Sequence, residues 1–331
     1  MNIVYTTDDN FIIQVTTSIV SVYENNKADV NIFVLLKNVS EFNKNVLKTT
    51  AEKYGHDINL IELESIDVYF GLPVNTGGWN DIVLSRLFLD KILPSEVERV
   101  IYIDGDTIVR DSLNDLWNIN LNNNILGAVV EPVTSMKRKV QLGLEKEDPY
   151  YNAGILLIDL KKWKESNAGN RILNFYKAHN YKLFANDQDA INGELKGEIQ
   201  PIDIKYNYNN TFYYYPYWFL KKKDNNLPSK DIYKDSISNP YVIHYLGEER
   251  PWREGNRHEY RNEYVNYYHM TYFGKEAKNK DGIIEYGWKK YFLFWNLFNT
   301  IIKPFPGLRL FIINKGIPIV MKMRSRTIQN V

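Results

Sequence analysis

The sequence predicts a Rossmann-like α/β fold, in which a mixed but mostly parallel sheet is flanked by helices. Short apolar runs of strand length alternate with segments of helical periodicity in the first third of the chain. Two of those runs end in loops rich in Asp and Asn, at the strand ends where α/β sheets bind ligands. With 331 residues, 44% of them hydrophobic and 24% charged, the chain is long enough to bury a substantial core.

The expected elements follow from the spacing of apolar residues. Strands are predicted at 3–5, 32–36, 58–61, 100–103, 126–130, 154–158 and 241–244. Helices are predicted at 12–25, 41–54, 81–92, 160–178 and 187–196, where apolar residues recur every three or four positions. Residues 205–235 are rich in Asn, Tyr and Lys and are predicted to form loops.

The composition changes towards the C-terminus. Residues 286–331 contain eight Lys or Arg and no Asp or Glu, interleaved with bulky apolar residues, whereas residues 1–285 carry 33 basic and 40 acidic residues. One interpretation is peripheral contact with an anionic membrane, in which apolar side chains insert and basic ones meet the headgroups. The other is a helical appendage that packs on the rest of the protein.

Several classes of function and location are disfavoured. A net charge of +1 gives no reason to expect nucleic-acid binding. The absence of cysteine excludes disulfides, a thiolate nucleophile and a zinc–thiolate site. We expect no signal peptide and no transmembrane helix, because no basic segment precedes an apolar one at the N-terminus and no long uncharged apolar run occurs. These features fit a cytoplasmic protein.

The sharpest local feature is Asp104-Gly105-Asp106, directly after the strand predicted at 100–103. Two carboxylates separated by glycine can point into one site from a tight turn, and hard divalent cations prefer such oxygen ligands. A metal ion there can bridge two phosphates. The alternative is that the carboxylates cap loops or face solvent, since Asp187-Gln188-Asp189 has the same spacing.

His244 ends a predicted strand and precedes Gly247 and Arg250. A single His on an apolar strand is commonly a core residue. Gly247 leaves room for a phosphate and Arg250 can bind one, so His244 beside them also fits the role of a metal ligand. An imidazole with two carboxylates favours manganese over magnesium or calcium.

Neutral polar residues form a third group of candidates. Residues 151–154 precede a strand, and residues 187–189 precede a helix. Their Asn, Gln and Asp side chains suit the hydroxyls of a polyol, but they are equally typical of turns and helix N-caps.

In their order along the chain, these segments resemble glycosyltransferase family 8, above all its bacterial lipooligosaccharide galactosyltransferases. The resemblance runs from residue 1 to about residue 255. It covers residues 1–10, 85–87, 100–106, 110–113, 152–160, 187–189 and 244–252.

The resemblance implies a GT-A fold and a retaining transfer of a hexose from a UDP-sugar to a hydroxyl of a carbohydrate acceptor on a glycan or glycoconjugate. Galactose is expected before glucose, and Mn²⁺ before Mg²⁺. Residues 1–255 would form the catalytic domain, with a nucleotide-sugar half at about 1–110 and an acceptor half at about 111–255. Residues 256–331 would form a basic helical appendage. Because such relatives act on membrane-bound glycans, the resemblance also suggests a place at the inner face of the membrane.

The resemblance also assigns roles to individual residues. The metal ligands would be Asp104, Asp106 and His244. The donor would be bound by Thr6, Asp8, Asn10, Phe11, Arg86, Asp104, Gly105, Glu131, Asn152, Ala153, Asp187, Gln188, Gly247 and Arg250, with Phe11 stacking on the uracil. Gln188, Asp187 and Arg86 would act in catalysis.

The chain departs from the family pattern at three places. Arg250 replaces a lysine and keeps its charge. Glu131 replaces the aspartate of close relatives and moves a carboxylate near the donor sugar or the acceptor. Residues 76–80, which include Trp79, differ from those relatives and would reshape the mouth of the site.

Retention of configuration permits two mechanisms. Double displacement needs a carboxylate nucleophile, for which Asp187 is the candidate. Gln188 is the family's closest group to the nucleophile position, and an amide is a poor nucleophile. We therefore expect a front-face substitution, in which the acceptor hydroxyl attacks from the side on which UDP departs.

A UDP-sugar hydrolase and a non-catalytic UDP-sugar-binding protein are the alternative functions. The aromatic segment 213–219 fits a wall for an oligosaccharide, and it fits equally a lid or a patch packed on the C-terminal segment.

Overall fold

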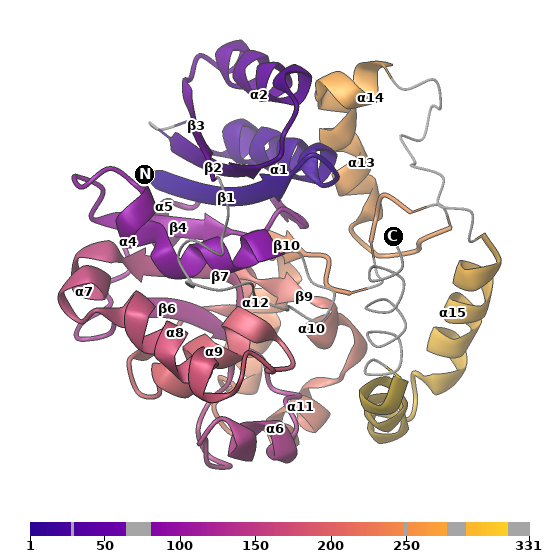
Figure 1. The fold of residues 1–331 in the computed structure, drawn as a ribbon. Helices are drawn as coiled ribbons and strands as arrows, with labels where there is room; N and C mark the ends of the chain where they lie inside the picture. The colour runs from indigo at the N-terminus through magenta and orange to yellow at the C-terminus, as the bar shows by residue number, and fades with distance from the viewer. Residues whose placement is uncertain (28–29, 64–80, 248–249, 254, 277–288, 317–331) are drawn as a thin grey trace.

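The computed structural model describes residues 1–27, 30–63, 81–247, 250–253, 255–276 and 289–316. Residues 76–80, including Trp79, lie outside this part of the chain. A central sheet has the strand order β3-β2-β1-β4-β7-β6-β8 (Figure 1). Its strands are β1 (Asn2–Asp8), β2 (Asn31–Lys37), β3 (Ile58–Glu62), β4 (Arg99–Ile103), β6 (Leu126–Val130), β7 (Tyr151–Asp159) and β8 (Ile199–Pro201).

Among these strands only β7 runs against its neighbours, β4 and β6. The other paired strands are parallel, which confirms the mostly parallel sheet predicted from the sequence. Successive residues of β1 point to opposite faces, so Ile3 and Tyr5 join one buried cluster and Val4 joins the other. The sheet therefore has a hydrophobic core on each side.

Helices cover both faces (Figure 1). The helices that the structure describes are α1 (Ile12–Asn25), α2 (Glu41–Lys53), η1 (Asp81–Phe88), α4 (Leu89–Ile92), α5 (Asn114–Trp117), α6 (Met136–Gln141), α7 (Leu160–Glu165), α8 (Ala168–Ala178), α9 (Asn186–Glu194), η2 (Ile204–Tyr206), α10 (Asn210–Tyr214), α11 (Tyr217–Lys223), α12 (Lys230–Ser238), α13 (Arg261–Met270), α14 (Tyr272–Glu276) and α15 (Lys289–Ile302), some of which lie away from the sheet. A further helix spans 306–316.

Three segments differ in detail from their predictions. Residues 81–92 are mostly a 3₁₀-helix, η1, in place of one α-helix. The helix predicted at 160–178 is broken, because Asn167 adopts a left-handed conformation with φ 55° between α7 and α8. Residues 205–235, predicted as loop, contain the short strand β9 (Tyr208–Asn209) and three helices, α10, α11 and α12.

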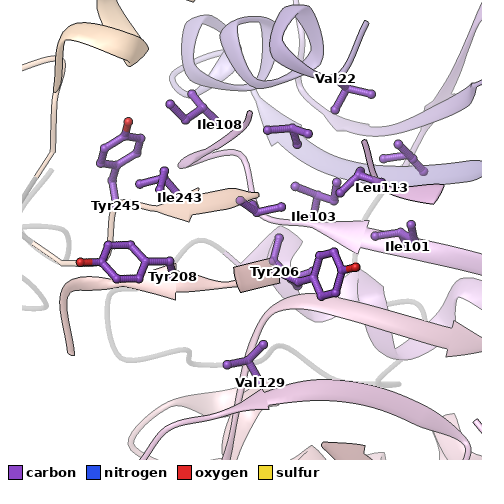
Figure 2. Close-up of a cluster of buried hydrophobic side chains, with 14 of the residues drawn as sticks. Val22, Ile101, Ile103, Ile108, Leu113, Val129, Tyr206, Tyr208, Ile243 and Tyr245 are labelled. Atoms are coloured by element: carbon purple, nitrogen blue, oxygen red, sulfur yellow. The ribbon is translucent and has the colours of Figure 1, made fainter. Parts of the chain in front are cut away.

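A second, three-stranded sheet lies beside the first. It has the order β5-β10-β9, in which β5 (Thr107–Val109) is antiparallel to β10 (Val242–His244) and β9 is parallel to it. Figure 2 shows Ile108 and Ile243 of this sheet near Ile103 of the central sheet, in one buried cluster. The strand predicted at 241–244 is therefore present as β10, but it belongs to this small sheet.

The C-terminal segment packs partly on the rest of the molecule. Ile302, Arg309 and Leu310 are buried, and the Arg309 guanidinium lies 3.8 Å from the centre of the Tyr214 ring. The interpretation as a packed helical appendage therefore holds for one side of this segment. No helix in the described residues is long and apolar enough to cross a membrane.

The break at Asn167 gives a test of the fold. A left-handed backbone costs a residue with a Cβ about 1–2 kcal/mol, and glycine avoids that cost. We expect Asn167→Ala to lower the free energy of unfolding by about 1 kcal/mol relative to Asn167→Gly. Both variants lose the hydrogen bond from Asn170 to Asn167, so the comparison isolates the backbone. Urea unfolding measures the difference, and equal stability of the two variants would contradict the assignment.

Candidate active site

The direction of β7 explains why the candidate residues meet at one edge of the sheet. Asp8 ends β1, Asp104 follows β4, and Glu131 follows β6, so all three lie at the carboxyl ends of parallel strands. Because β7 runs the opposite way, its first residues, including Asn152 and Ala153, lie at that same edge. The Asp104 amide donates to the Gly154 carbonyl at 2.8 Å, which joins the loop to β7.

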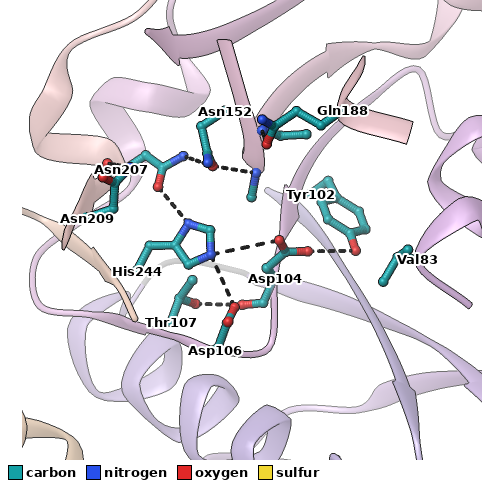
Figure 3. Close-up of polar contacts among 12 residues, drawn as sticks. Val83, Tyr102, Asp104, Asp106, Thr107, Asn152, Gln188, Asn207, Asn209 and His244 are labelled. Atoms are coloured by element: carbon teal, nitrogen blue, oxygen red, sulfur yellow. Dashed lines mark hydrogen bonds and ion pairs between the residues drawn. The ribbon is translucent and has the colours of Figure 1, made fainter. Parts of the chain in front are cut away.

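Asp104, Asp106 and His244 form a compact group (Figure 3). The His244 Nε2 atom lies 3.2 Å from Asp106 Oδ1 and 3.9 Å from Asp104 Oδ2. One potential ligand atom from each residue lies within 4.8 Å of the others. The pairing of His244 with Thr107 across β5 and β10 brings the imidazole to the acidic loop.

The three groups influence one another's ionisation. Burial raises the pKa of Asp104, against the opposing charge of Arg86. Burial also opposes ionisation of Asp106, yet the imidazole of His244 holds the pKa of Asp106 below its usual range. For His244 burial favours the neutral form, but Asp106 and Asp104 raise its pKa above 6.5. The two carboxylates therefore favour a positive charge beside them, either on the imidazole or on a bound cation.

Asn207, which no pattern in the sequence indicated, is fully buried between His244 and Asn152. Its Oδ1 atom lies 2.9 Å from His244 Nδ1, and its Nδ2 atom donates to Asn152 Oδ1 at 2.9 Å. Because the amide oxygen only accepts, His244 carries its proton on Nδ1 when neutral, and the lone pair on Nε2 faces the carboxylates. Two carboxylates and an imidazole held this way fit a divalent metal ion.

Gly154 was also missed as a site residue. A Cβ at this position would lie 2.1 Å from His244 Cε1, so only glycine leaves room for the imidazole. Its place inside an apolar strand is the sequence signal that marks a close approach of another group.

Arg86 connects two parts of the site. The buried guanidinium lies 2.9 Å from Asp104 Oδ1 through Nη2 and 3.0 Å from Asp187 Oδ2 through Nε. It also lies over the Tyr102 ring, 4.2 Å from the ring centre. Thr6, expected at the donor, is buried beside the Tyr102 hydroxyl, 3.0 Å away.

The Asp187-Gln188-Asp189 segment lies in the first turn of α9. Asp187 and Gln188 face the candidate site, whereas Asp189 does not. Asp187 pairs with Arg86, and burial raises the pKa of Asp187 to about 6 despite that partner. The Gln188 Oε1 atom accepts from the Ala153 amide at 3.0 Å, which fixes the side chain at the start of β7. Asp189 instead turns into the core, where it accepts from Arg138 and Tyr150.

Glu131 directly follows β6 at the same edge of the sheet. Burial raises its pKa, and its Oε1 atom accepts from the Thr211 hydroxyl at 2.7 Å. Thr211 belongs to the first turn of α10, so this helix fixes the carboxylate that departs from the family pattern.

The candidate nucleotide-binding residues surround the end of β1. The Phe11 amide and the Asn10 side chain both donate to the Asp8 carboxylate, which orders the turn before α1. A Cβ on Gly105 would lie 2.4 Å from Val15 Cγ2, so glycine allows the acidic loop to approach α1.

Arg250 lies near Phe11 of this turn, and its Nε atom donates to the Gly247 carbonyl at 2.7 Å. Gly247 has φ +66°, and the Arg250 guanidinium lies 5.9 Å from the centre of the Phe11 ring and 5.4 Å from that of Trp252. Positive charge and an aromatic face are thereby brought next to the Asp8 turn.

Residues 2–256 match the family model described as glycosyl transferase family 8, and the chain belongs to this family. It is 30% identical over 262 residues to a putative glycosyltransferase of Haemophilus influenzae, covering 78% of this chain and 74% of that protein. It is 28% identical over 260 residues to a lipopolysaccharide 1,2-glucosyltransferase of Escherichia coli K12, covering 77% and 73%.

The solved structure of the galactosyltransferase LgtC with donor and acceptor sugar analogues is similar to this one. The TM-score is 0.71 at 25% identity, covering 82% of this chain and 96% of that one. The predicted GT-A fold is thereby confirmed.

Asn207 gives a test of the metal site. We expect Asn207→Leu to weaken Mn²⁺ binding by about 10–100-fold, because the imidazole loses the partner that fixes its tautomer. Calorimetry on the protein without donor measures this directly. Asn26→Leu is the control, because Asn26 is equally buried but bonds the Leu113 amide. If both variants bind Mn²⁺ like the wild type, Asn207 does not orient the ligand.

Proposed function

We propose that this protein transfers a hexose from a UDP-sugar to a hydroxyl of a carbohydrate acceptor, with retention of configuration. The observation that carries the proposal is the meeting of Asp104, Asp106 and His244 with the Arg86–Asp187 pair and Gln188 at one edge of the sheet. Membership of family 8 supports the transferase class.

Asp104, Asp106 and His244 would hold Mn²⁺, with Mg²⁺ as a substitute. The bound ion would supply positive charge to the departing diphosphate as a Lewis acid. Arg250 and the backbone at Gly247 would contact the same diphosphate. These two residues and the bound metal ion would then stabilise the leaving group together.

The rest of the donor would lie along the sheet edge. Asp8 and Asn10 would bind the uridine and Phe11 would stack on the uracil, near the Arg250 charge. The hexose would lie against residues from several helices, strands and loops, and these would orient its hydroxyls. The residues are Thr6, Arg86, Asp104, Gly105, Glu131, Asn152, Ala153, Asp187 and Gln188.

The ion pair of Asp187 supports a front-face mechanism over double displacement. Its Oδ2 atom lies 3.0 Å from Arg86 Nε, and a carboxylate whose charge is so engaged is a weakened nucleophile. The acceptor hydroxyl would attack on the face from which UDP departs, and a β-phosphate oxygen would take its proton. Gln188, positioned by the Ala153 amide, would stabilise the oxocarbenium-like state.

Galactose is the favoured donor sugar and glucose the next. The structural neighbour is a galactosyltransferase, whereas the relative from E. coli is a lipopolysaccharide glucosyltransferase. Both kinds of relative favour a glycan or glycoconjugate acceptor. We further propose the catalytic domain at 1–255, with its two halves divided near residue 110, and peripheral contact of the C-terminal segment with the inner face of a membrane.

UDP release from a panel of UDP-hexoses tests the transferase site. We expect Mn²⁺-dependent turnover of one UDP-hexose, reduced about 100-fold or more in Asp106→Ala. Glu259→Ala is the control, because this exposed acid accepts a hydrogen bond from the Tyr208 hydroxyl and does not belong to the metal-ligand group. Free hexose formed without consumption of acceptor would indicate a hydrolase, and UDP binding without turnover of any donor would indicate a binding protein.

Metal binding should depend on pH. Mn²⁺ needs the neutral imidazole, and the neighbouring carboxylates raise the pKa of His244 above 6.5. Below that raised pKa, the proton must leave before the ion binds, so affinity should fall about tenfold per pH unit as the pH is lowered. Calorimetry across neutral pH measures this slope, and a flat profile would exclude His244 as a ligand.

A further inference from the structure

The side-chain amide of Gln188 has a hydrogen-bond partner at each end. Its Oε1 atom accepts from the Ala153 amide at 3.0 Å, and its Nε2 atom donates to the Tyr150 hydroxyl at 3.0 Å. The Ala153 N–H can only donate, so it holds the oxygen end of the Gln188 amide against β7. A hydroxyl can donate or accept, so the second contact is a hydrogen bond only if the proton of Tyr150 points away from Gln188.

The surroundings of Tyr150 fix the direction of that proton. The hydroxyl lies 2.7 Å from Asp189 Oδ1 and 2.6 Å from Arg138 Nη2. A carboxylate only accepts, whereas a guanidinium only donates. The single proton of Tyr150 therefore goes to Asp189, and its two lone pairs accept from Arg138 and Gln188. Burial raises the pKa of Tyr150 well above 10, so the hydroxyl keeps this proton at neutral pH.

Asp189 is in turn held as the acceptor. Its side chain is 1% exposed, and its Oδ1 atom also accepts from Arg138 Nε at 2.6 Å. Its Oδ2 atom accepts from the Ala185 amide at 2.8 Å, just before α9. The Arg138 guanidinium lies 4.8 Å from the centre of the Tyr150 ring and 4.9 Å from that of Phe184, which hold it in place. Charged and backbone donors thus bond both oxygens of Asp189, which acts only as an acceptor.

These bonds form a directed chain from Gln188 through Tyr150 to Asp189. Hydrogen bonds in such a chain polarise one another. Donation to Asp189 makes the Tyr150 oxygen a stronger acceptor, and donation by Gln188 Nε2 then increases the negative charge on Gln188 Oε1. An amide oxygen polarised in this way suits the stabilisation of a positively charged, oxocarbenium-like state.

We propose that Tyr150 is a positioning residue, which orients and polarises Gln188 through a hydroxyl whose proton Arg138 and Asp189 direct. The chemical role of Tyr150 rests on the proposed function, whereas the orientation of the amide stands on the hydrogen bonds alone. Tyr150 directly precedes β7 and does not belong to the metal-ligand group, so its role is separate from holding the ion.

The side-chain amide signal of Gln188 in nitrogen-15 NMR spectra tests the orientation without any donor. The signal is identified by its absence from Gln188→Glu. Tyr150→Phe keeps the ring and removes the hydroxyl, so we expect it to shift this signal and to speed the exchange of its protons with water. Tyr176→Phe is the matched control, because Tyr176 is equally buried and its hydroxyl donates to Asn186, also in the first turn of α9, at 2.8 Å. The control should leave the Gln188 signal in place.

The kinetics of UDP release test the chemical role. Tyr150→Phe should lower kcat about tenfold, the effect of one buried hydrogen bond, and leave KM for the UDP-hexose within about twofold. In the Gln188→Ala background the same substitution should lower kcat no further, because the residue through which Tyr150 acts is gone. Tyr176→Phe should leave kcat unchanged in the otherwise wild-type protein.

Asp189→Asn is a second variant for the NMR measurement. Its amide can donate to the Tyr150 hydroxyl and turn the proton towards Gln188, so the Gln188 signal should shift here too. A signal that stays unchanged in both variants, with melting temperatures that show them folded, would overturn the proposal.

An equal loss of kcat in the wild-type and Gln188→Ala backgrounds would also overturn it, because Tyr150 would then act through the core and not through Gln188. If the wild type releases no UDP from any UDP-hexose while the NMR signals behave as expected, the proposed function fails and the orientation of Gln188 stands.

Discussion

The candidate site depends on one buried positive charge, the guanidinium of Arg86. Asp104 and Asp187 come from elements far apart in the chain and meet at the edge of the sheet, where Asp187 is buried and Asp104 is half-buried. Without a shared counter-charge their mutual repulsion and desolvation would favour protonation or exposure. Arg86 pairs with both and with the Tyr102 ring, so the acidic loop, α9 and β4 are held in one arrangement. The 3₁₀ geometry of η1, which was not predicted, is the backbone that presents this arginine.

The central sheet was predictable because its strands are short, apolar and separated by amphipathic helices. The elements that were missed depend on contacts distant in sequence. Strand β9 has two residues and exists only because β10 provides its partner, and no local pattern indicates it. Asn167 breaks a helix whose apolar spacing continues on both sides, so periodicity alone gave no reason to divide it.

Much the same holds for the site. The acidic residues after β1 and β4 could be identified because the carboxyl ends of parallel strands bind ligands. Asn207 could not, since its pairing with His244 requires the small sheet to be known first. Asp187 and Asp189 have identical chemistry two positions apart, yet the helix turns one towards Arg86 and the other towards Arg138. The spacing of residues in the sequence therefore indicates candidate site residues, and the direction of each side chain decides which of them belong to the site.

The absence of a side chain at Gly154 has a consequence for comparing sequences. The imidazole of His244 occupies the volume that any Cβ at position 154 would need. Gly154 in β7 and His244 in β10 therefore depend on each other, and only the two together indicate that this arrangement is kept. Among chains that keep this fold, loss of the glycine should accompany loss or displacement of the histidine. The pair distinguishes members that have kept the candidate metal-ligand set from those that have kept only the fold.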